Sequence, residues 1–219
     1  MAGMPVVQLP SPGVVAGRPR KEGIYDTEVE ATGSATGTSL TLFSNFSAFT
    51  TAPVTVTATK QYGRDVNLRG TTSGLPKSTH LFWYEWRCKI RPLGTNLASA
   101  ANNANGTSVT EEILRYRQTS SIQFEFSQTV LIQAQLDELP DGVGPAWGST
   151  THTASILLGP NCVPERKGKI VTISGKPVSI DEQQEFSVTL KQPQLTFNPT
   201  ADLFITIFLE GMLLRAITG

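Results

Sequence analysis

The sequence predicts an all-β sandwich of about eight to ten strands, because apolar residues recur at every second position and turn residues interrupt the chain at short intervals. From residue 39 onward, segments rich in Val, Ile, Thr and aromatic residues alternate with loops that carry Pro, Gly and Asn. Hydrophobic residues make up 39% of the 219 residues, which is enough for a sizeable core. We therefore predict one β-sandwich domain over residues 39–219, preceded by an extended N-terminal arm over residues 1–38.

The predicted arm is defined by its Pro and Gly content, which makes a regular element unexpected before about residue 24. Its prolines are Pro5, Pro10, Pro12 and Pro19. Its charges nearly balance: Arg18, Arg20 and Lys21 stand against Glu22, Asp26, Glu28 and Glu30. Such a segment is either an arm that threads along a neighbouring subunit or a disordered terminus, and the sequence favours neither.

In the first half of the domain, strands are expected at 40–43, 54–59 and 79–91. The segment 79–91 has the sharpest alternation. One face carries Phe82, Tyr84, Trp86, Cys88 and Ile90, and the other carries Leu81, Trp83, Glu85, Arg87 and Lys89. The first face is therefore predicted to be core and the second to be mixed.

In the second half, a short helix is expected at 109–118, with Glu111 and Glu112 in its first turn and Arg115 and Arg117 near its end. Strands are expected at 122–126, 130–136, 153–158, 169–174, 185–191 and 203–214, with a bend, bulge or tight hairpin at 127–129. The last strand is apolar on both faces, so it is either a central strand covered on both sides or a strand with one face against another subunit. Strands joined by long crossing loops favour Greek-key connections of the jelly-roll type.

No catalytic, cofactor-binding or metal site is predicted. The chain has two histidines, His80 and His152, without the close spacing of a metal site. Cys88 lies in an apolar strand pattern that favours a buried thiol, although a bond to Cys162 is conceivable. The carboxylates Glu125, Asp137 and Glu138 form a glycosidase-like pair only if folding brings two of them within roughly 5–9 Å.

The aromatic residues around the strand 79–91 admit a second interpretation. Trp83, Tyr84, Trp86 and Trp147 would suit a platform on which a sugar ring stacks. Tyr84 and Trp86 share a face with apolar residues, so core packing is favoured for both. Trp83 has the opposite parity and is the candidate for an exposed aromatic side chain, at a sugar or at a subunit contact.

Charge and composition disfavour several classes of function. The formal net charge is zero and charged residues make up 16%, against about 25% in typical domains. Direct, sequence-specific nucleic-acid binding is disfavoured because it usually needs a basic balance. Neither a signal peptide nor an apolar run long enough to span a membrane is apparent, which favours a soluble protein made in the cytoplasm.

Three segments of the second half follow one another in a notable order. Residues 113–116 read ILRY, residues 139–142 read LPDG, and residues 203–211 read LFITIFLEG. With the strands between them, they give the region 109–217 an order that resembles the jelly-roll coat proteins of tailless icosahedral bacteriophages, including those whose shells enclose a membrane. The length of the chain suits a single barrel rather than two.

The resemblance implies a structural capsid protein that self-assembles into an icosahedral shell and is not an enzyme. It implies other copies of the chain as partners, together with other capsid or vertex proteins and, in some members, an inner membrane. The implied location is the virion, after synthesis in the host cytoplasm. Two rival functions remain: a carbohydrate- or receptor-binding domain of a phage fibre or secreted module, and a hydrolase or lyase on a sandwich scaffold.

Overall fold

The computed structural model describes residues 20–31, 39–50, 57–68, 74–93, 109–127, 129–139, 169–170, 176–192 and 202–215. The first strands along the chain are β1 (Arg20–Glu30), β2 (Ser39–Leu42) and β3 (Thr79–Leu93), followed by the helix α1 (Val109–Thr119). Then come β4 (Ser121–Phe126), β5 (Thr129–Gln135), the 3₁₀ turn η1 (Leu136–Glu138), β6 (Lys169–Ile170), β7 (Val178–Ile180), β8 (Phe186–Lys191) and β9 (Asp202–Arg215). The predicted all-β class with one short helix is confirmed.

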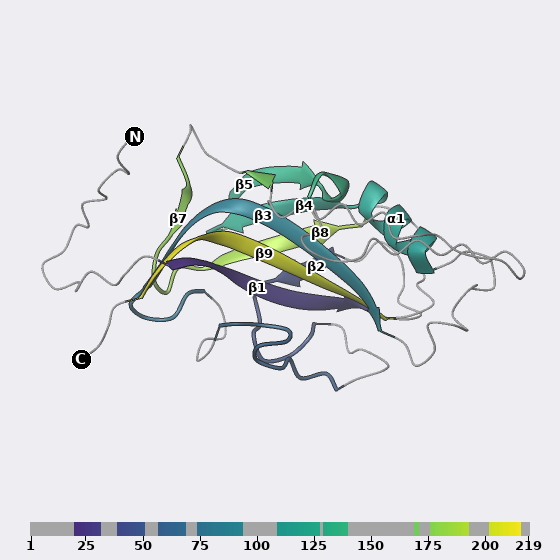
Figure 1. The fold of residues 1–219 in the computed structure, drawn as a ribbon, viewed down its shortest axis with the longest axis horizontal. Helices are drawn as coiled ribbons and strands as arrows, with labels where there is room; N and C mark the ends of the chain where they lie inside the picture. Colours follow the sequence, from purple (N-terminus) through teal and green to yellow (C-terminus); the bar gives the residue numbers. More distant parts are fainter. Residues whose placement is uncertain are drawn as a thin grey trace, which may run out of the picture.

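The strands pair as a nested set of hairpins. β1 pairs with β9, β2 with β8, β3 with both β6 and β7, and β4 with β5, all of them antiparallel. β6 and β7 pair with successive stretches of β3 and act as one interrupted strand. Pairing of β3 with β9 and of β4 with β8 then rolls the long hairpin into two sheets, ordered β1-β9-β3-β6 and β2-β8-β4-β5. This nested arrangement is a jelly roll (Figure 1).

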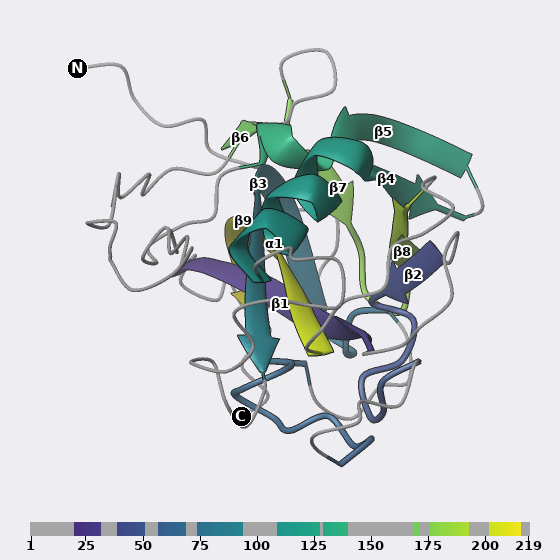
Figure 2. The same cartoon turned by 90° about the vertical axis from the view of Figure 1, so that its right-hand side faces the viewer.

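The two sheets face each other across one hydrophobic core. Figure 2 shows β1, β9 and β3 on one side and β2, β8, β4 and β5 on the other, with α1 across the near end. The rings of Trp83 on β3 and Phe124 on β4 lie 4.5 Å apart between centroids and join the sheets at the centre. Trp86, Tyr116 and Phe43 are fully buried in the same core.

A β-bulge in β3 changes which residues face the core. Trp83 pairs with Gly211 and Glu85 pairs with Glu210, so Tyr84 is an extra residue without a partner on β9. The extra residue reverses the alternation. The buried residues of β3 are therefore Leu81 and Trp83 before the bulge and Trp86, Cys88 and Ile90 after it. The predicted core face is right beyond the bulge and wrong before it.

The predicted boundary of the arm at residue 38 is wrong, because part of that segment is a strand of the sandwich. β1 pairs along its full length with β9, from Arg20 opposite Leu213 to Glu30 opposite Leu203. The Pro and Gly residues that predict an irregular segment end at Pro19, and Gly23 is accommodated within β1. The prediction of an arm over residues 1–19 lies outside the described residues.

β9 is a central strand with both faces covered, which is the first of the two alternatives predicted for it. It lies between β1 and β3. Its inner face contributes Leu203, Ile205, Ile207 and Leu209 to the core. On its outer face, Phe204 contacts the ring of Phe49 at 5.7 Å and Phe208 contacts the ring of Tyr25 at 5.5 Å, measured between centroids.

Residues 43–50 and 57–68, here called the covering segment, lie along the open side of the sandwich between β1 and β2 (Figures 1 and 2). Two backbone hydrogen bonds hold its halves together, from the Phe49 N–H to Ala58 and from the Lys60 N–H to Ser47. Val66 forms a β-bridge with Asp26 at the free edge of β1. The Asn67 side chain accepts a hydrogen bond from the Tyr25 N–H and donates one to the Gly23 carbonyl, so it pairs with that edge as a strand would.

The β4–β5 hairpin and α1 agree with their predictions. Phe126 pairs with Thr129, so the two strands form a tight hairpin. A bulge on β5 lies close to this turn, because Phe124 pairs with Ile132 and Glu125 with Val130, which leaves Leu131 as an extra residue. α1 ends one residue beyond its predicted end. It buries Tyr116 in the core, and Arg117 donates a hydrogen bond to the Leu139 carbonyl just beyond η1.

The remaining predicted strands have different outcomes. Those at 40–43, 185–191 and 203–214 correspond to β2, β8 and β9, and the start of the one at 169–174 corresponds to β6. The strand predicted at 153–158 lies outside the described residues. So do residues 54–56 of the strand predicted at 54–59; its described part, 57–59, is not a strand, and Thr59 forms only an isolated bridge with Ala48. β7 was not predicted, because three residues are too few to display a period. In the part of the chain that the structure describes, no helix has the length and apolar character to cross a membrane.

Candidate functional site

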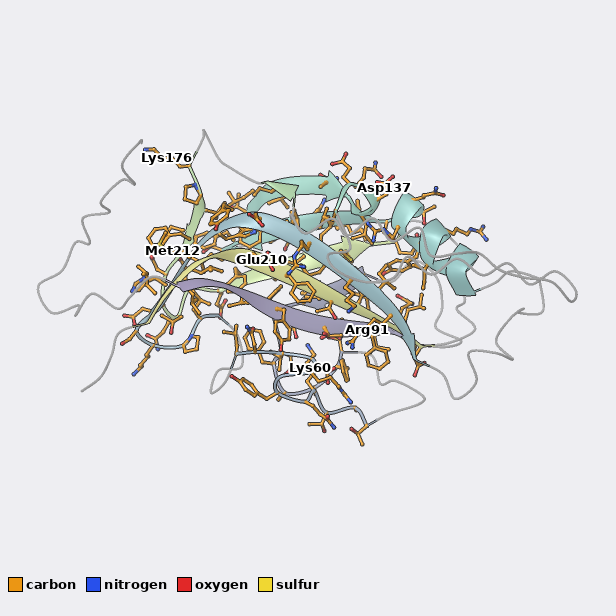
Figure 3. All side chains as sticks on the ribbon, in the orientation of Figure 1. Lys60, Arg91, Asp137, Lys176, Glu210 and Met212 are labelled. Atoms are coloured by element: carbon orange, nitrogen blue, oxygen red, sulfur yellow. The ribbon has the colours of Figure 1, made fainter. Side chains whose placement is uncertain are left out.

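A buried ion cluster joins the covering segment to β1. The Lys60 ammonium lies 2.8 Å from Oδ1 of Asp26 and 2.6 Å from Oε1 of Glu28, and it donates a 2.7 Å hydrogen bond to the Asn45 carbonyl. The three charged side chains have no exposed surface. Figure 3 shows Lys60 beside β1, on the side where the covering segment lies. We call Asp26, Glu28 and Lys60 the edge cluster.

The edge cluster faces the interior of the sandwich. Asp26 and Glu28 lie opposite Ile207 and Ile205 of β9, which are core residues, so the carboxylates occupy inward positions on an edge strand. Backbone N–H groups also donate hydrogen bonds to these carboxylates. Phe43 donates to Oδ2 of Asp26 at 2.6 Å, Thr27 to its Oδ1 at 2.9 Å, and Thr50 to Oε2 of Glu28 at 2.8 Å.

Burial dominates the electrostatics of both carboxylates. Desolvation raises the pKa of Asp26, and the Lys60 ammonium together with the N–H groups of Phe43 and Thr27 offsets only part of that effect. Desolvation likewise raises the pKa of Glu28, to about 7, and the nearby Asp26 adds a small further rise. Lys60 and the Thr50 N–H lower this pKa only in part. The cluster is therefore held together by contacts but is costly to charge.

The chemistry of the edge cluster is structural. A substrate has no access to groups without exposed surface, so these carboxylates do not form an accessible acid–base pair. The hydrogen bonds from Phe43 and Thr50, with the ion pairs from Lys60, attach the covering segment to β1 at several points. The edge cluster therefore holds the covering segment against β1, the edge strand of its sheet.

The aromatic residues of β3 do not form a sugar platform. Trp83, the predicted exposed aromatic, is fully buried, and its ring packs edge-on against that of Trp86 at 5.4 Å between centroids. Its indole N–H donates a 2.9 Å hydrogen bond to the Glu85 carbonyl. The prediction for Trp83 is wrong because the bulge at Tyr84 turns it into the core. Trp86 is core as predicted, Tyr84 is half-buried, and Trp147 lies outside the described residues.

Histidine and the isolated carboxylates show no catalytic grouping in the described part of the chain. Nδ1 of His80 lies 3.2 Å from Oδ1 of Asp181 at the surface, an ordinary polar contact. No cluster of three or more His, Cys, Asp or Glu side chains suited to a metal occurs among the described residues. Asp137 and Glu138 are exposed on η1, and Glu125 is half-buried on β4. His152 lies outside the described residues.

Cys88 is a free, fully buried thiol, in agreement with its predicted core position. Burial raises its pKa to about 12, and Arg117 counters this only in part. A thiol held in the protonated form is a poor nucleophile and a poor metal ligand. Its conceivable partner Cys162 lies outside the described residues.

A different kind of surface occurs at the free edge of β5. Among the described residues, the exposed large apolar side chains are Tyr62, Val130 and Leu131, at 50%, 47% and 40% exposure. Two of the three are neighbours on β5, whose sequence TVLIQAQ carries no charge. β5 is the outermost strand of its sheet, and its described pairing is with β4 alone. Sequence analysis predicted the strand but missed this surface, because its position at a sheet edge depends on the topology.

The other sheet edges are covered or short. The free edge of β1 is occupied by Val66 and by the Asn67 side chain. β2 has four residues, and β6 and β7 have two and three. β5 has seven residues and is the longest described edge strand without such cover, with a bulge at Leu131 that interrupts its regular pairing.

No protein-family model, curated protein or solved structure that was compared matches this chain.

Proposed function

We propose that this protein is a structural capsid protein that self-assembles into an icosahedral virion shell. The observation that carries the proposal is the single jelly roll, together with the uncharged edge strand β5 that exposes Val130 and Leu131. Jelly rolls occur in viral capsids, lectins and cupins. Exposed apolar surface on an edge strand suits contact with other protein subunits.

The charge distribution supports lateral association. A net charge of zero lets like subunits approach without strong mutual repulsion. The buried charges of the edge cluster are paired within one subunit and take no part in subunit contacts. The proposed partners are further copies of the chain, other capsid or vertex proteins and, if the shell encloses one, a membrane. Sequence-specific binding of nucleic acid is not part of the proposal, and the proposed location is the virion, after synthesis in the host cytoplasm.

The alternative of a carbohydrate- or receptor-binding domain has less support. Its expected feature is a strip of exposed aromatic rings. In the described part of the chain, Trp83 and Trp86 are in the core and Tyr62 is the one large aromatic side chain that is exposed. The enzymatic alternative needs an accessible pair of carboxylates or a metal site. The edge cluster is inaccessible, and Cys88 is both buried and protonated. We therefore propose that the protein is not an enzyme.

Purified full-length protein tests the proposal. We expect closed shells, or sheets of pentameric and hexameric arrays, in negative-stain images, and a matching series of large species in sedimentation. A discrete monomer at all concentrations that binds immobilised glycans would contradict the capsid function and support the alternative.

A further inference from the structure

The edge cluster places one amine against two carboxyl groups in a site that has no solvent-exposed surface. Nζ of Lys60 lies 2.8 Å from Oδ1 of Asp26 and 2.6 Å from Oε1 of Glu28, although Asp26 and Lys60 are 34 residues apart in the chain. Figure 3 shows Lys60 beside β1, the strand that carries both carboxyl groups. An amine and a carboxyl group held in contact are the two reactants of an amide bond.

Burial brings these two groups close to their reactive forms. A hydrogen bond joins Nζ of Lys60 to Oδ1 of Asp26, so one proton that moves along it converts the ammonium and the carboxylate into a free amine and a carboxylic acid. Desolvation raises the pKa of Asp26 and thereby favours this transfer. The amine nitrogen then faces Cγ, to which Oδ1 is bonded. Atoms held about 3–3.5 Å apart in a fixed orientation react as if they were highly concentrated.

Asp26 is the carboxyl group that is positioned to be attacked. The Phe43 N–H donates a 2.6 Å hydrogen bond to its Oδ2, and the Thr27 N–H donates a 2.9 Å hydrogen bond to its Oδ1. Attack on Cγ places negative charge on the oxygen that remains, which is Oδ2. The Phe43 N–H therefore lies where a donor stabilises the tetrahedral intermediate.

Glu28 is positioned to carry protons during the same reaction. Its Oε2 accepts a hydrogen bond from the Thr50 N–H, whereas its Oε1 lies beside the amine and accepts no hydrogen bond from the described residues. Burial raises the pKa of Glu28 to about 7. A carboxyl group that titrates near neutral pH can both donate and accept a proton there.

We propose that Lys60 and Asp26 condense spontaneously into an isopeptide bond, with Glu28 as the catalytic proton carrier. Nζ of Lys60 forms a bond to Cγ of Asp26. Glu28 gives its proton to Oδ1, which already carries the proton from the ammonium, and the Cγ–Oδ1 bond breaks as water leaves. Nζ returns one proton to Glu28. An ammonium and a carboxylate thus become an amide and one water molecule, and neither an oxidant nor a cofactor is needed.

The reaction is a single event within one chain, so it needs no access for an external substrate. The absence of exposed surface at the three side chains favours the bond, because water is needed to hydrolyse an amide. The bond makes the attachment of the covering segment to β1 covalent. It lies within one subunit, so the inference goes beyond the proposed function and does not depend on it.

The first test is the mass of the full-length protein, measured by mass spectrometry after unfolding and reduction. We expect a mass lower by one water molecule than the mass calculated from the sequence. A mass equal to the calculated value would overturn the inference. This measurement uses the wild-type chain and does not depend on the folding of any variant.

Peptide mapping locates the lost water. Trypsin does not cleave after a lysine whose Nζ is acylated, so residues 22–64 are expected as one peptide, in place of residues 22–60. Chymotrypsin cleaves after Phe43, between Asp26 and Lys60, and is expected to leave two pieces that stay joined. Fragmentation of this product should place the link at Asp26. A link at Glu28, or a water lost elsewhere in the chain, would contradict the proposal.

Glu28→Gln tests the proton carrier, because it preserves the size of the side chain but removes its titration. We expect the link to form at least about a hundredfold more slowly during refolding, as followed by intact mass. Glu185→Gln, at an exposed position, is the matched control and should form the link at the wild-type rate. Circular dichroism confirms that both variants are folded. A link that forms at the wild-type rate in Glu28→Gln would overturn the role assigned to Glu28.

Discussion

Lys60 shows how a buried charge is retained at the margin of a sandwich. Its ammonium donates hydrogen bonds to Asp26 and to the Asn45 carbonyl, and it forms an ion pair with Glu28. The two carboxylates also accept hydrogen bonds from backbone N–H groups of the covering segment. Because an unpaired buried charge is costly, the covering segment and β1 depend on each other.

Lys60→Met is expected to destabilise the protein by about 3–5 kcal/mol, because two carboxylates would remain buried without their cation. The free energy of unfolding from urea titration measures the effect. Lys77→Met is the control: Lys77 is exposed, and a surface substitution of this kind changes stability by only about 0.5 kcal/mol. Similar values for the two variants would show that the edge cluster does not support the fold.

Glu28 makes the stability depend on pH. Its pKa rises from 4.5 to about 7 on folding, so the folded state holds a proton that the unfolded state has lost between these values. The contribution is fully present below pH 4.5 and is lost as the pH rises through about 7. The raised pKa of Asp26 acts in the same direction.

Glu28→Gln tests this dependence. Wild-type protein is expected to lose on the order of 3 kcal/mol between about pH 4.5 and 7.5 from this group, whereas Glu28→Gln loses less over the same range. Urea unfolding at both pH values gives the difference. Glu185→Gln, at an exposed position, should retain the wild-type dependence. A wild-type protein that becomes more stable over this range, with Glu28→Gln unchanged from it, would contradict the assignment.

At the residue scale, the burial of single residues was predictable from the sequence, whereas contacts between residues distant in the chain were not. Cys88 and Trp86 were identified as core because they lie in an apolar alternation. The edge cluster was missed because Asp26 and Lys60 are 34 residues apart and no pattern relates them. A signal was present, since Asp26, Glu28 and Glu30 alternate with Thr27 and Val29 as strand residues do. It was outweighed by the Pro and Gly residues that precede them.

At the element scale, the bulge in β3 depends on one glycine in β9. A Cβ added to Gly211 would lie 1.9 Å from the Phe82 carbonyl oxygen and 2.9 Å from the Cα of Trp83. Both are backbone atoms, so the clash has no inexpensive relief. The bulge and the inward position of Trp83 therefore both depend on Gly211.

Gly211→Ala is expected to cost about 3 kcal/mol or more in the free energy of unfolding, because strands β3 and β9 must separate to admit the methyl group. Gly63→Ala is an informative comparison. Its Cβ would meet nothing within 4 Å, and only its φ of +83° opposes the change, at a cost of about 1–2 kcal/mol. A Gly211→Ala protein as stable as Gly63→Ala would show that the bulge relaxes.

Truncation distinguishes the arm from the strand. Removal of residues 1–30 takes away β1, uncovers the edge of β9 and leaves Lys60 without its carboxylates, so we expect no folded domain by circular dichroism. Removal of residues 1–19 leaves β1 in place and tests the predicted arm. If that variant folds but forms no shells, the arm takes part in assembly; shells of normal form would assign it no role there.

Elements were predictable where their own residues set the pattern. α1, the β4–β5 hairpin and β9 follow from helix-start charges, tight alternation and continuous apolar character. The inverted face of β3 before Tyr84 was not predictable, because the bulge becomes visible only when Trp83 and Glu85 are paired with Gly211 and Glu210. The pairing partner, rather than the strand itself, determines it.

At the scale of the whole molecule, charged side chains take part in buried contacts within the subunit, whereas the edge proposed for contacts between subunits is uncharged. Ion pairs are buried within the subunit at the edge cluster, while β5, the edge strand proposed for contacts with other subunits, has no charge. Screening by salt acts mainly on exposed charges. Association through β5 should therefore respond little to ionic strength.

The dissociation constant of subunit association is expected to change less than about threefold between about 0.05 and 0.5 M NaCl, since the proposed contact surface at β5 is uncharged. Sedimentation equilibrium at the two salt concentrations measures it. Steep weakening with salt would indicate that ion pairs outside β5 control association.

The nested pairing also has a consequence for the timing of synthesis. β4 and β5 are neighbours in the chain and can pair soon after both leave the ribosome, but Thr27 meets Thr206 across 179 residues. Strand pairings of such long range form slowly, because the chain loses the entropy of closing a large loop before any contact offsets that loss. Until β9 emerges, the carboxylates of β1 have no neighbouring strand on that side and neither half of the jelly roll is closed. The uncharged edge of β5 is thus presented by a nascent chain before the domain is complete, and correct folding depends on β9 arriving before β5 meets another chain.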